Sequence, residues 1–138
     1  MQRITPYLLY EDCAGALVFL SKAFGFEETL RYEDGGTINH AEMRVGGDSW
    51  IMMGSPGKDF ESPKRGGYTG SQIYVYVDDV DAHFERAKAA GAEIADEPED
   101  MFYGDRAYSA KDPEGHRWSF ATQVKEIAPE EWGATTPS

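Results

Sequence analysis

A histidine and a glutamate two residues apart are the side chains of this sequence best suited to chemistry. His40 and Glu42 lie in the stretch from Thr37 to Val45, whose alternation of apolar and polar residues predicts a strand. Residues i and i+2 of a strand point to one face, so we expect the two side chains to be neighbours. Such a pair can act as a general base. It is equally typical of a solvated strand edge, and the spacing leaves both interpretations open.

Tyr103 and Arg106 are a second candidate pair. They flank Gly104 in the turn before the predicted strand from Asp105 to Lys111. At the mouth of a pocket, the Arg106 guanidinium would bind a carboxylate or a ring carbonyl of a ligand. The chain also holds 25 acidic residues, so an ion pair at the surface is an alternative role for Arg106.

The composition is that of an acidic globular chain. Its 138 residues include 25 acidic and 13 basic side chains, which gives a formal net charge of −12. Such a surface repels phosphate backbones, so nucleic acid is not an expected partner. Hydrophobic residues make up 41% of the chain, enough for a core. No stretch is long enough to span a membrane, and we expect no membrane partner.

Cysteine usage points to a reducing compartment. Cys13 is the single cysteine, so an internal disulfide is excluded. The N-terminal residues lack the apolar run of a signal peptide, and we expect a cytoplasmic protein. Neither a phosphate-binding loop, a dinucleotide fingerprint nor a CxxC motif occurs, so the sequence predicts no cofactor.

The candidate side chains must be positioned by a pattern of strands and helices that occurs twice. Apolar residues at helical spacing predict one helix after Asp12 and another after Asp78 or Asp79. Gly25 and Gly91 are expected to end these helices. Strands are predicted at 4–10, 26–33, 37–45, 49–53, 72–77, 92–95, 105–111 and 116–123.

The pattern repeats at a fixed offset. A shift of 66 residues aligns Asp12 with Asp78 and Gly25 with Gly91. One copy cannot bury both faces of its sheet, so we expect the two copies to stack. The predicted organisation is one domain over 1–124, with modules at about 3–54 and 70–124, a linker rich in Gly, Pro and Ser at 55–69, and a tail at 125–138.

The strand predicted at 72–77 has two unlike faces. Its aliphatic residues should pack under a helix, whereas Gln72 and Tyr74 point the other way. In the earlier strand at 49–53, Trp50 and Met52 share one face in the same manner. Apolar walls with a few polar groups are typical of a ligand pocket. Exposure of these faces to water is the alternative.

Four groups of residues carry a family resemblance. They are PYLLYEDCA with AFGF (6–14 and 23–26), NHAEMRVGGD (39–48), FYGDR (102–106) and DPEGHRW (112–118). Together with the repeat they resemble the opening strand and helix and the hairpins of the vicinal oxygen chelate superfamily, the glyoxalase, bleomycin-resistance and extradiol dioxygenase group. The first hairpin is similar to that of its PhnB-like subgroup. The resemblance extends over about 4–123.

The resemblance implies an α+β fold in which two βαβββ modules form a curled mixed sheet around a pocket, in a homodimer. It also implies that metal-dependent members take His, Glu or Gln ligands from four strands. The corresponding positions here are Thr5 or Pro6, Met52, Gln72 and Ser119, and only Gln72 is a usual ligand type. We therefore predict no metal and no glyoxalase I chemistry.

The leading hypothesis is a glyoxalase/bleomycin-resistance-like protein that binds a small organic molecule, cationic or aromatic in character, without the metal of its family. A metal-independent isomerase or lyase that uses His40 with Glu42, or Tyr103 with Arg106, is the alternative. A metal-dependent lyase or dioxygenase with displaced ligands is the third possibility. The candidate ligand-binding residues are Tyr7, Trp50, Met52, Gln72, Tyr74, Tyr103, Arg106 and Ser119.

Overall fold

The computed structural model describes residues 2–66 and 69–137, so two residues of the expected linker and both chain ends lie outside the described residues. Within these ranges the elements are β1 (Tyr7–Leu9), α1 (Cys13–Phe24), β2 (Glu27–Asp34), β3 (Thr37–Val45), β4 (Ser49–Gly54), α2 (Pro63–Gly66), β5 (Gln72–Tyr76), α3 (Val80–Ala89), β6 (Glu93–Asp100), β7 (Asp105–Lys111), β8 (Arg117–Gln123) and the 3-10 turn η1 (Pro129–Trp132).

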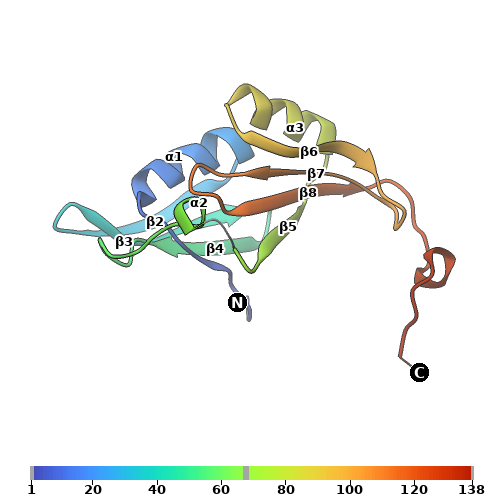
Figure 1. Ribbon diagram of the computed structural model, residues 1–138, viewed down its shortest axis with the longest axis horizontal. Coiled ribbons are helices and arrows are strands. Elements are labelled where there is room, and N and C mark those ends of the chain that lie inside the picture. The colour runs from blue at the N-terminus through green and yellow to red at the C-terminus, as the bar shows by residue number, and fades with distance from the viewer. Residues whose placement is uncertain (1, 67–68, 138) are drawn as a thin grey trace.

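The strands form two four-stranded sheets of the same topology (Figure 1). The order is β1-β4-β3-β2 in the first sheet and β5-β8-β7-β6 in the second. In each sheet the first strand of the module runs parallel to the last one, and the other pairs are antiparallel. Helices α1 and α3 lie on the same side of the sheets in Figure 1. The predicted fold of two βαβββ modules is confirmed.

Aspartates begin both long helices, as the sequence predicted. The Asp12 carboxylate accepts a hydrogen bond from the Gly15 backbone N–H at 2.9 Å, and Asp79 accepts one from Ala82 at 3.1 Å. These bonds satisfy N–H groups that have no partner within the helix. Gly25 ends α1 with a φ of 78°, a left-handed conformation that glycine adopts without strain.

The structural repeat has an offset of 67 residues and not the predicted 66. The register places Tyr7 beside Met52 in the first sheet and Tyr74 beside Ser119 in the second. Tyr74 therefore corresponds to Tyr7, and Ser119 to Met52, each 67 positions later in the chain. The second helix is capped by Asp79, so Asp12 corresponds to Asp79. Helix α3 has 10 residues against 12 in α1. The alignment on glycines was wrong because the shorter second helix shifts the terminal glycine.

Strand β6, whose beginning was predicted at 92–95, runs through Pro98 to Asp100. A proline cannot donate to a sheet ladder and is tolerated at an edge or a bulge. β6 is the edge strand of its sheet, and its register with β7 shifts between Asp96 and Glu99. The sequence predicted only the beginning of this strand, since Asp-Glu-Pro is also a typical loop sequence.

The core lies between the helices and the sheets and is rich in aromatic rings. Phe24, at the end of α1, lies 4.7 Å from Phe120 and 5.8 Å from Trp118 of β8, measured between ring centroids. Trp118 and Phe120 are fully buried. Because Phe24 belongs to the first module and its neighbours to the second, the two modules share one core.

A turn between β7 and β8 joins the modules through a buried carboxylate. Asp112 is 4% exposed and accepts hydrogen bonds from the Tyr10 hydroxyl at 2.6 Å and from the Trp118 indole N–H at 3.2 Å. Its other oxygen accepts from the backbone N–H groups of Glu114 and His116. Burial, and next the charge of Asp112, hold the pKa of Tyr10 well above its usual value. We call this arrangement the Asp112 junction.

The chain after β8 continues along the second module. The backbone N–H groups of Val124 and Lys125 both donate to the Gly104 carbonyl. The 3-10 turn η1 follows, and its Trp132 ring lies 5.4 Å from Phe102. None of the helices among the described residues combines the length and the apolar character needed to cross a membrane.

Candidate functional site

Each sheet has one face buried under the helices and one face that stays open. In the first sheet, buried Leu8, Ala41 and Met53 alternate with outward residues. We call the outward side the first open face. It consists of Tyr7, Leu9, Leu30, Tyr32, His40, Glu42, Trp50 and Met52.

A chain of three polar side chains occupies the middle of the first open face. The Tyr7 hydroxyl lies 2.9 Å from His40 Nδ1, and His40 Nε2 lies 2.8 Å from a carboxylate oxygen of Glu42. When Nε2 carries the proton and donates it to Glu42, Nδ1 is free to accept the hydrogen bond of Tyr7. The predicted proximity of His40 and Glu42 is found, and the structure adds Tyr7. The arrangement can move a proton between a phenol and an imidazole.

The second sheet has an open face of different composition. The buried residues Tyr108, Trp118 and Phe120 alternate with the outward side chains of β7 and β8. We call the outward side the second open face. It consists of Gln72, Tyr74, Tyr76, Asp105, Ala107, Ser109, Arg117 and Ser119, with Tyr103 at its end.

Three tyrosines surround one buried carboxylate at the end of the second open face. Asp105 is only 4% exposed, and its Oδ2 accepts hydrogen bonds from Tyr74 at 2.7 Å and Tyr76 at 2.8 Å. The Tyr103 hydroxyl lies 3.3 Å from that of Tyr74. Burial, with help from the hydrogen bonds to Tyr103 and Asp105, raises the pKa of Tyr74. The hydrogen bond to Asp105 is the main cause that raises the pKa of Tyr76.

Further aromatic rings extend this group, which we call the Asp105–tyrosine cluster. Tyr74 and Tyr76 lie 5.5 Å apart between centroids, and Phe102 lies 5.2 Å from Tyr103. Trp132 packs against Phe102, as described above. The cluster therefore draws its rings from β5, from the turn before β7 and from the C-terminal segment.

Arg106 does not join Tyr103 at the open face, which corrects the prediction. It precedes the buried Tyr108 by two residues in β7 and so points to the helix side of the sheet. There it pairs with Asp81 at 3.2 Å and Asp100 at 3.1 Å. The surface ion pair that the sequence left as the alternative is what the structure contains. These carboxylates raise the pKa of Arg106 further above its usual value.

The other predicted binding residues lie on the open faces. Trp50 and Met52 belong to β4, and Arg44 lies over the Trp50 ring at 5.8 Å from its centroid. On the second face, the Ser119 hydroxyl donates to the Gln72 side-chain oxygen at 3.4 Å. The two sets come from different modules, so a ligand that contacts both must lie between them.

Two cavities lie at this boundary between the modules. One of about 510 Å³ is lined by Tyr7, Leu9 and Gln72 among others. Another of about 550 Å³ is lined by Trp50, Tyr74 and Tyr76 among others. Both sizes are within the range of small-molecule sites.

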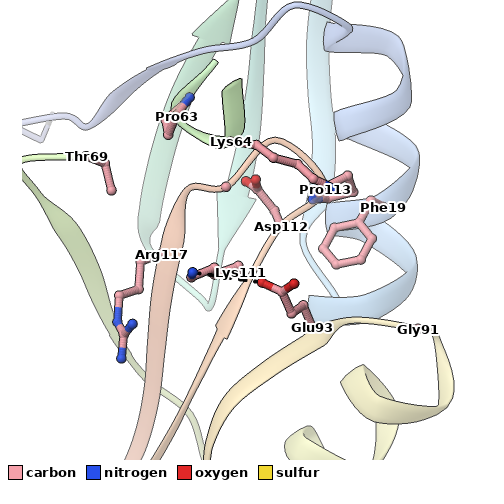
Figure 2. A pocket seen from close by; sticks show the side chains of 11 residues that line it. Phe19, Pro63, Lys64, Thr69, Gly91, Glu93, Lys111, Asp112, Pro113 and Arg117 are labelled. Atoms are coloured by element: carbon pink, nitrogen blue, oxygen red, sulfur yellow. Dashed lines mark ion pairs between the residues drawn. The ribbon is translucent and has the colours of Figure 1, made fainter. Parts of the chain in front are cut away.

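A third cavity, of about 540 Å³, borders the Asp112 junction and is lined by Asp112, Lys111 and Phe19 among others (Figure 2). Except for Lys64, its ionisable groups are already engaged. Lys111 is paired with Glu93, Arg117 binds Asp96, and Asp112 belongs to the junction. Figure 2 shows that these side chains do not converge on one point. The cavity is therefore a weaker candidate than the open faces.

The metal-ligand positions that the family resemblance implies are Thr5 or Pro6, Met52, Gln72 and Ser119. In the register Met52 lies beside Tyr7, and Ser119 lies beside Tyr74 with its hydroxyl 3.4 Å from the Gln72 side-chain oxygen. A hydroxyl, a thioether and a single amide are not the usual donor set for a divalent ion. Over 2–66 and 69–137, no group of three or more His, Cys, Asp or Glu side chains is arranged to hold a metal ion.

Asp105 is the polar residue that the sequence analysis did not identify. The sequence placed it at the start of a predicted strand and within the FYGDR segment, without a role in binding. The alternation of β7, read backward from an inward-pointing Tyr108, is the signal that would have placed Asp105 on the open face. Its contacts with Tyr74 and Tyr76 span 31 and 29 residues, so no local pattern predicts them.

Comparison with known proteins gives the family. The profile of the Glyoxalase/Bleomycin resistance protein/Dioxygenase superfamily matches residues 3–120. The uncharacterized protein Mb0911c of Mycobacterium bovis is 35% identical over 142 residues, which cover 98% of this chain and 92% of that protein.

Solved structures agree with this assignment. TioX from Micromonospora sp. ML1 is 37% identical with a TM-score of 0.74, covering 90% of this chain and 100% of TioX. The fosfomycin resistance protein FosX of Listeria monocytogenes shares the fold at 20% identity and a TM-score of 0.66, covering 88% of this chain and 93% of FosX. The chain belongs to the Glyoxalase/Bleomycin resistance protein/Dioxygenase superfamily.

Proposed function

We propose that this protein binds a small organic molecule, aromatic or cationic in character, between its two open faces and without a metal ion. The observation that carries the proposal is the exposure of large aromatic side chains beside placed polar groups. Tyr7 is 50% exposed, Tyr74 40% and Tyr76 63%, and all three border cavities of suitable size. A monomeric protein rarely exposes such a surface unless something covers it.

The donor set supports binding without a metal. A FosX structure contains Mn(II), so the fold is able to hold a metal ion in that protein. In this chain, the corresponding strand positions carry Thr5 or Pro6, Met52, Gln72 and Ser119, of which only Gln72 is a usual ligand type for a divalent ion. Binding would then rest on aromatic contact and hydrogen bonds.

The same exposed faces support a homodimer, which is common in this family. A second copy that covers the outer strands would bury Leu30 and Tyr32, which are 46% and 59% exposed. We also propose a cytoplasmic location, since the one cysteine, Cys13, is free and buried. Burial raises the pKa of its thiol to about 11, which is consistent with a structural and unreactive residue.

The binding proposal is tested by thermal shift with a panel of planar aromatic and cationic compounds, with and without added divalent metal. We expect a rise in Tm that does not need metal. Tyr7→Ala should weaken binding about tenfold, because an aromatic contact and its packing contribute on the order of 1–2 kcal/mol. Val18→Ala, at an exposed position of α1, is the matched control. A panel without any shift, or shifts only with metal, would contradict the proposal.

A second candidate function is favoured by the chain from Tyr7 through His40 to Glu42. Such a group supports metal-independent isomerisation or lyase chemistry next to a carbonyl. Tyr7 would take a proton from the substrate carbon as its own proton passes to His40 Nδ1, while the Glu42 carboxylate stabilises the imidazolium. In an isomerisation the proton then returns through Tyr7 to the neighbouring carbon, so the protein ends unchanged.

Variants of His40 test the second candidate. If the chain is catalytic, His40→Ala should lower turnover by about 10²–10⁴-fold, the usual contribution of general acid–base catalysis. Ligand affinity and the unfolding midpoint should change little, since His40 is on an open face. Arg106→Ala serves as the control outside the site. Full activity in His40→Ala would remove this function from consideration.

A further inference from the structure

The strongest unassigned feature is the buried carboxylate of the Asp105–tyrosine cluster. Asp105 is only 4% exposed, yet it takes part in no ion pair among the described residues. Arg106, the next residue, points to the other face and is already paired with two carboxylates. A carboxylate held in this way is stabilised only by neutral phenol donors, and its negative charge remains uncompensated.

The hydrogen bonds of the cluster fix the tyrosine rings around this charge. Tyr74 and Tyr76 both donate to the same oxygen, Oδ2, and the second oxygen takes no side-chain hydrogen bond within the described residues. Each hydroxyl is held near the carboxylate, so the rings extend from it into the open face. Tyr74 and Tyr76 also line the cavity of about 550 Å³.

This combination selects for a cation with an apolar surface. The face of an aromatic ring attracts a cation within about 6 Å, and a nearby carboxylate screened from water strengthens that attraction. An anion would be repelled by Asp105 and by the net charge of −12. A strongly hydrated metal ion would find a single carboxylate and neutral phenol oxygens here, too few charged oxygen ligands to replace its water shell. An organic ammonium keeps its charge on a weakly hydrated apolar surface.

We propose that Tyr74, Tyr76, Tyr103 and Asp105 form a subsite for an organic ammonium group. This inference rests on the proposed binding function and names the chemical class of one part of the ligand. The ammonium group lies against the tyrosine rings, with Asp105 behind them as the counter-charge. The remainder of the ligand extends into the cavity, toward Trp50 on its other wall.

The test compares two probes of equal shape and different charge. Choline and its uncharged carbon isostere, 3,3-dimethylbutan-1-ol, are titrated separately into the isotopically labelled protein, and amide resonances are followed by NMR. We expect choline to bind at least about tenfold more tightly and to shift resonances around Tyr74 and Asp105. Equal binding of the two probes, or no binding of choline, would overturn the subsite.

Two substitutions separate the subsite from the general acidity of the protein. Asp105→Asn keeps an oxygen that accepts from the tyrosines but removes the charge, and should reduce the preference for choline to within about twofold. Asp96→Asn removes the charge of Asp96, which pairs with Arg117 on the same sheet. This variant should leave the preference for choline over the isostere unchanged. Equal losses in both variants would mean that long-range charge is responsible, and the subsite would be wrong.

The outcome also distinguishes this inference from the binding function itself. If Asp105→Asn does not fold, Tyr76→Leu replaces an exposed ring and should weaken choline about fivefold or more without weakening the isostere. An unchanged choline affinity in that variant would overturn the subsite. If uncharged aromatic compounds bind at the open faces and choline does not, only the ammonium subsite is wrong. If none of these compounds perturbs either face, both proposals fail.

Discussion

Tyr7 and Tyr74 occupy equivalent positions in the two modules, but their hydroxyls bind different partners. Tyr7 lies 2.9 Å from the imidazole of His40, while Tyr74 lies 2.7 Å from the carboxylate of Asp105. With the offset of 67 residues, His40 corresponds to Ala107, so the second open face has an alanine where the first has an imidazole. The first partner can give and take a proton, whereas the second holds a fixed charge. One duplicated backbone therefore supports two kinds of chemistry.

The two faces also differ in what completes them. The first open face consists of strand residues alone. The Asp105–tyrosine cluster recruits Phe102 from a turn and Trp132 from the C-terminal segment. The contact between Phe102 and Trp132 depends on Gly104, whose φ of 106° and missing side chain let the Lys125 carbonyl approach closely. A duplicated module can thus diverge by substitution on a face and by new segments packed at its end.

The largest loss of stability is expected from a substitution in the Asp112 junction, which joins the two modules. Asp112→Ala removes the acceptor of two fully buried donors, the Tyr10 hydroxyl and the Trp118 indole. Each unsatisfied buried donor costs about 1–3 kcal/mol, so we expect a loss of about 3–5 kcal/mol in the free energy of unfolding. Urea unfolding followed by circular dichroism measures it.

Glu114→Gln is the control in the same turn. Glu114 accepts from the backbone N–H groups of Glu11 and Asp12, and glutamine keeps one such acceptor. We expect a smaller loss of about 1–2 kcal/mol, because one hydrogen bond to a charged acceptor is lost at an exposed position. A loss as large as that of Asp112→Ala would show that the junction does not depend on the buried carboxylate.

The next largest loss of stability is expected at the glycine in the turn before β7, compared with a glycine in a turn of the first module. Gly104→Ala should cost about 2–4 kcal/mol, because alanine is strained at a positive φ and its Cβ meets the Lys125 backbone. Gly35→Ala, in the turn between β2 and β3 with a φ of 61° and open space around it, should cost only about 1–2 kcal/mol. Near-ultraviolet circular dichroism should also report loss of Trp132 packing in Gly104→Ala alone. Equal costs would show that the segment after β8 adds nothing to the second face.

The ionisation of Tyr74 and Tyr76 is expected to give a smaller effect that is specific to the second open face. The pKa values of Tyr74 and Tyr76 are raised in the folded protein. A raised folded pKa means that the contribution to stability is present below the unfolded value of 10 and is lost as the pH rises through the folded value. Asp105→Asn should lower both pKa values, so two of the eight tyrosines ionise earlier in an ultraviolet difference titration.

The matched variant for this titration is on the other face. Glu42→Gln removes a carboxylate from the chain that begins at Tyr7 and should leave the ionisation of Tyr74 and Tyr76 unchanged. If both variants shift the titration equally, the effect comes from the net charge, and the distinction between the two faces is not electrostatic.

Local patterns predicted much of the fold and one half of the candidate site. The alternation of β5 correctly placed Gln72 and Tyr74 opposite the aliphatic residues, and the i, i+2 spacing placed His40 next to Glu42. These contacts follow from the geometry of one strand. The repeat was found as well, but alignment on the helix-ending glycines gave an offset that was wrong by one residue.

The other half of the site depends on contacts that no single strand determines. Tyr7 meets His40 across 33 residues, and Tyr74 meets Asp105 across 31. Both depend on the order of strands in a sheet, and a slip of one residue would turn each side chain to the other face. Arg106 was misplaced for another reason: it was grouped with Tyr103 by the turn, whereas the alternation of β7 puts it on the same side as the buried Tyr108.

The smallest expected effect concerns a histidine that belongs to neither open face. His83 lies on α3, with Nε2 3.0 Å from the Phe24 carbonyl of the first module and Nδ1 2.6 Å from the Tyr108 hydroxyl of the second. Burial is the main cause that lowers the pKa of His83 below its ordinary value of 6.5. Between the folded and unfolded pKa values the unfolded chain binds more protons, so the free energy of unfolding falls as the pH decreases from about 7 toward the folded pKa.

His83→Gln keeps a donor and an acceptor but does not titrate, and should flatten this part of the pH profile in urea unfolding. An equal slope in His83→Gln and in the unchanged protein would show that the burial of His83 between the modules does not set this pH response.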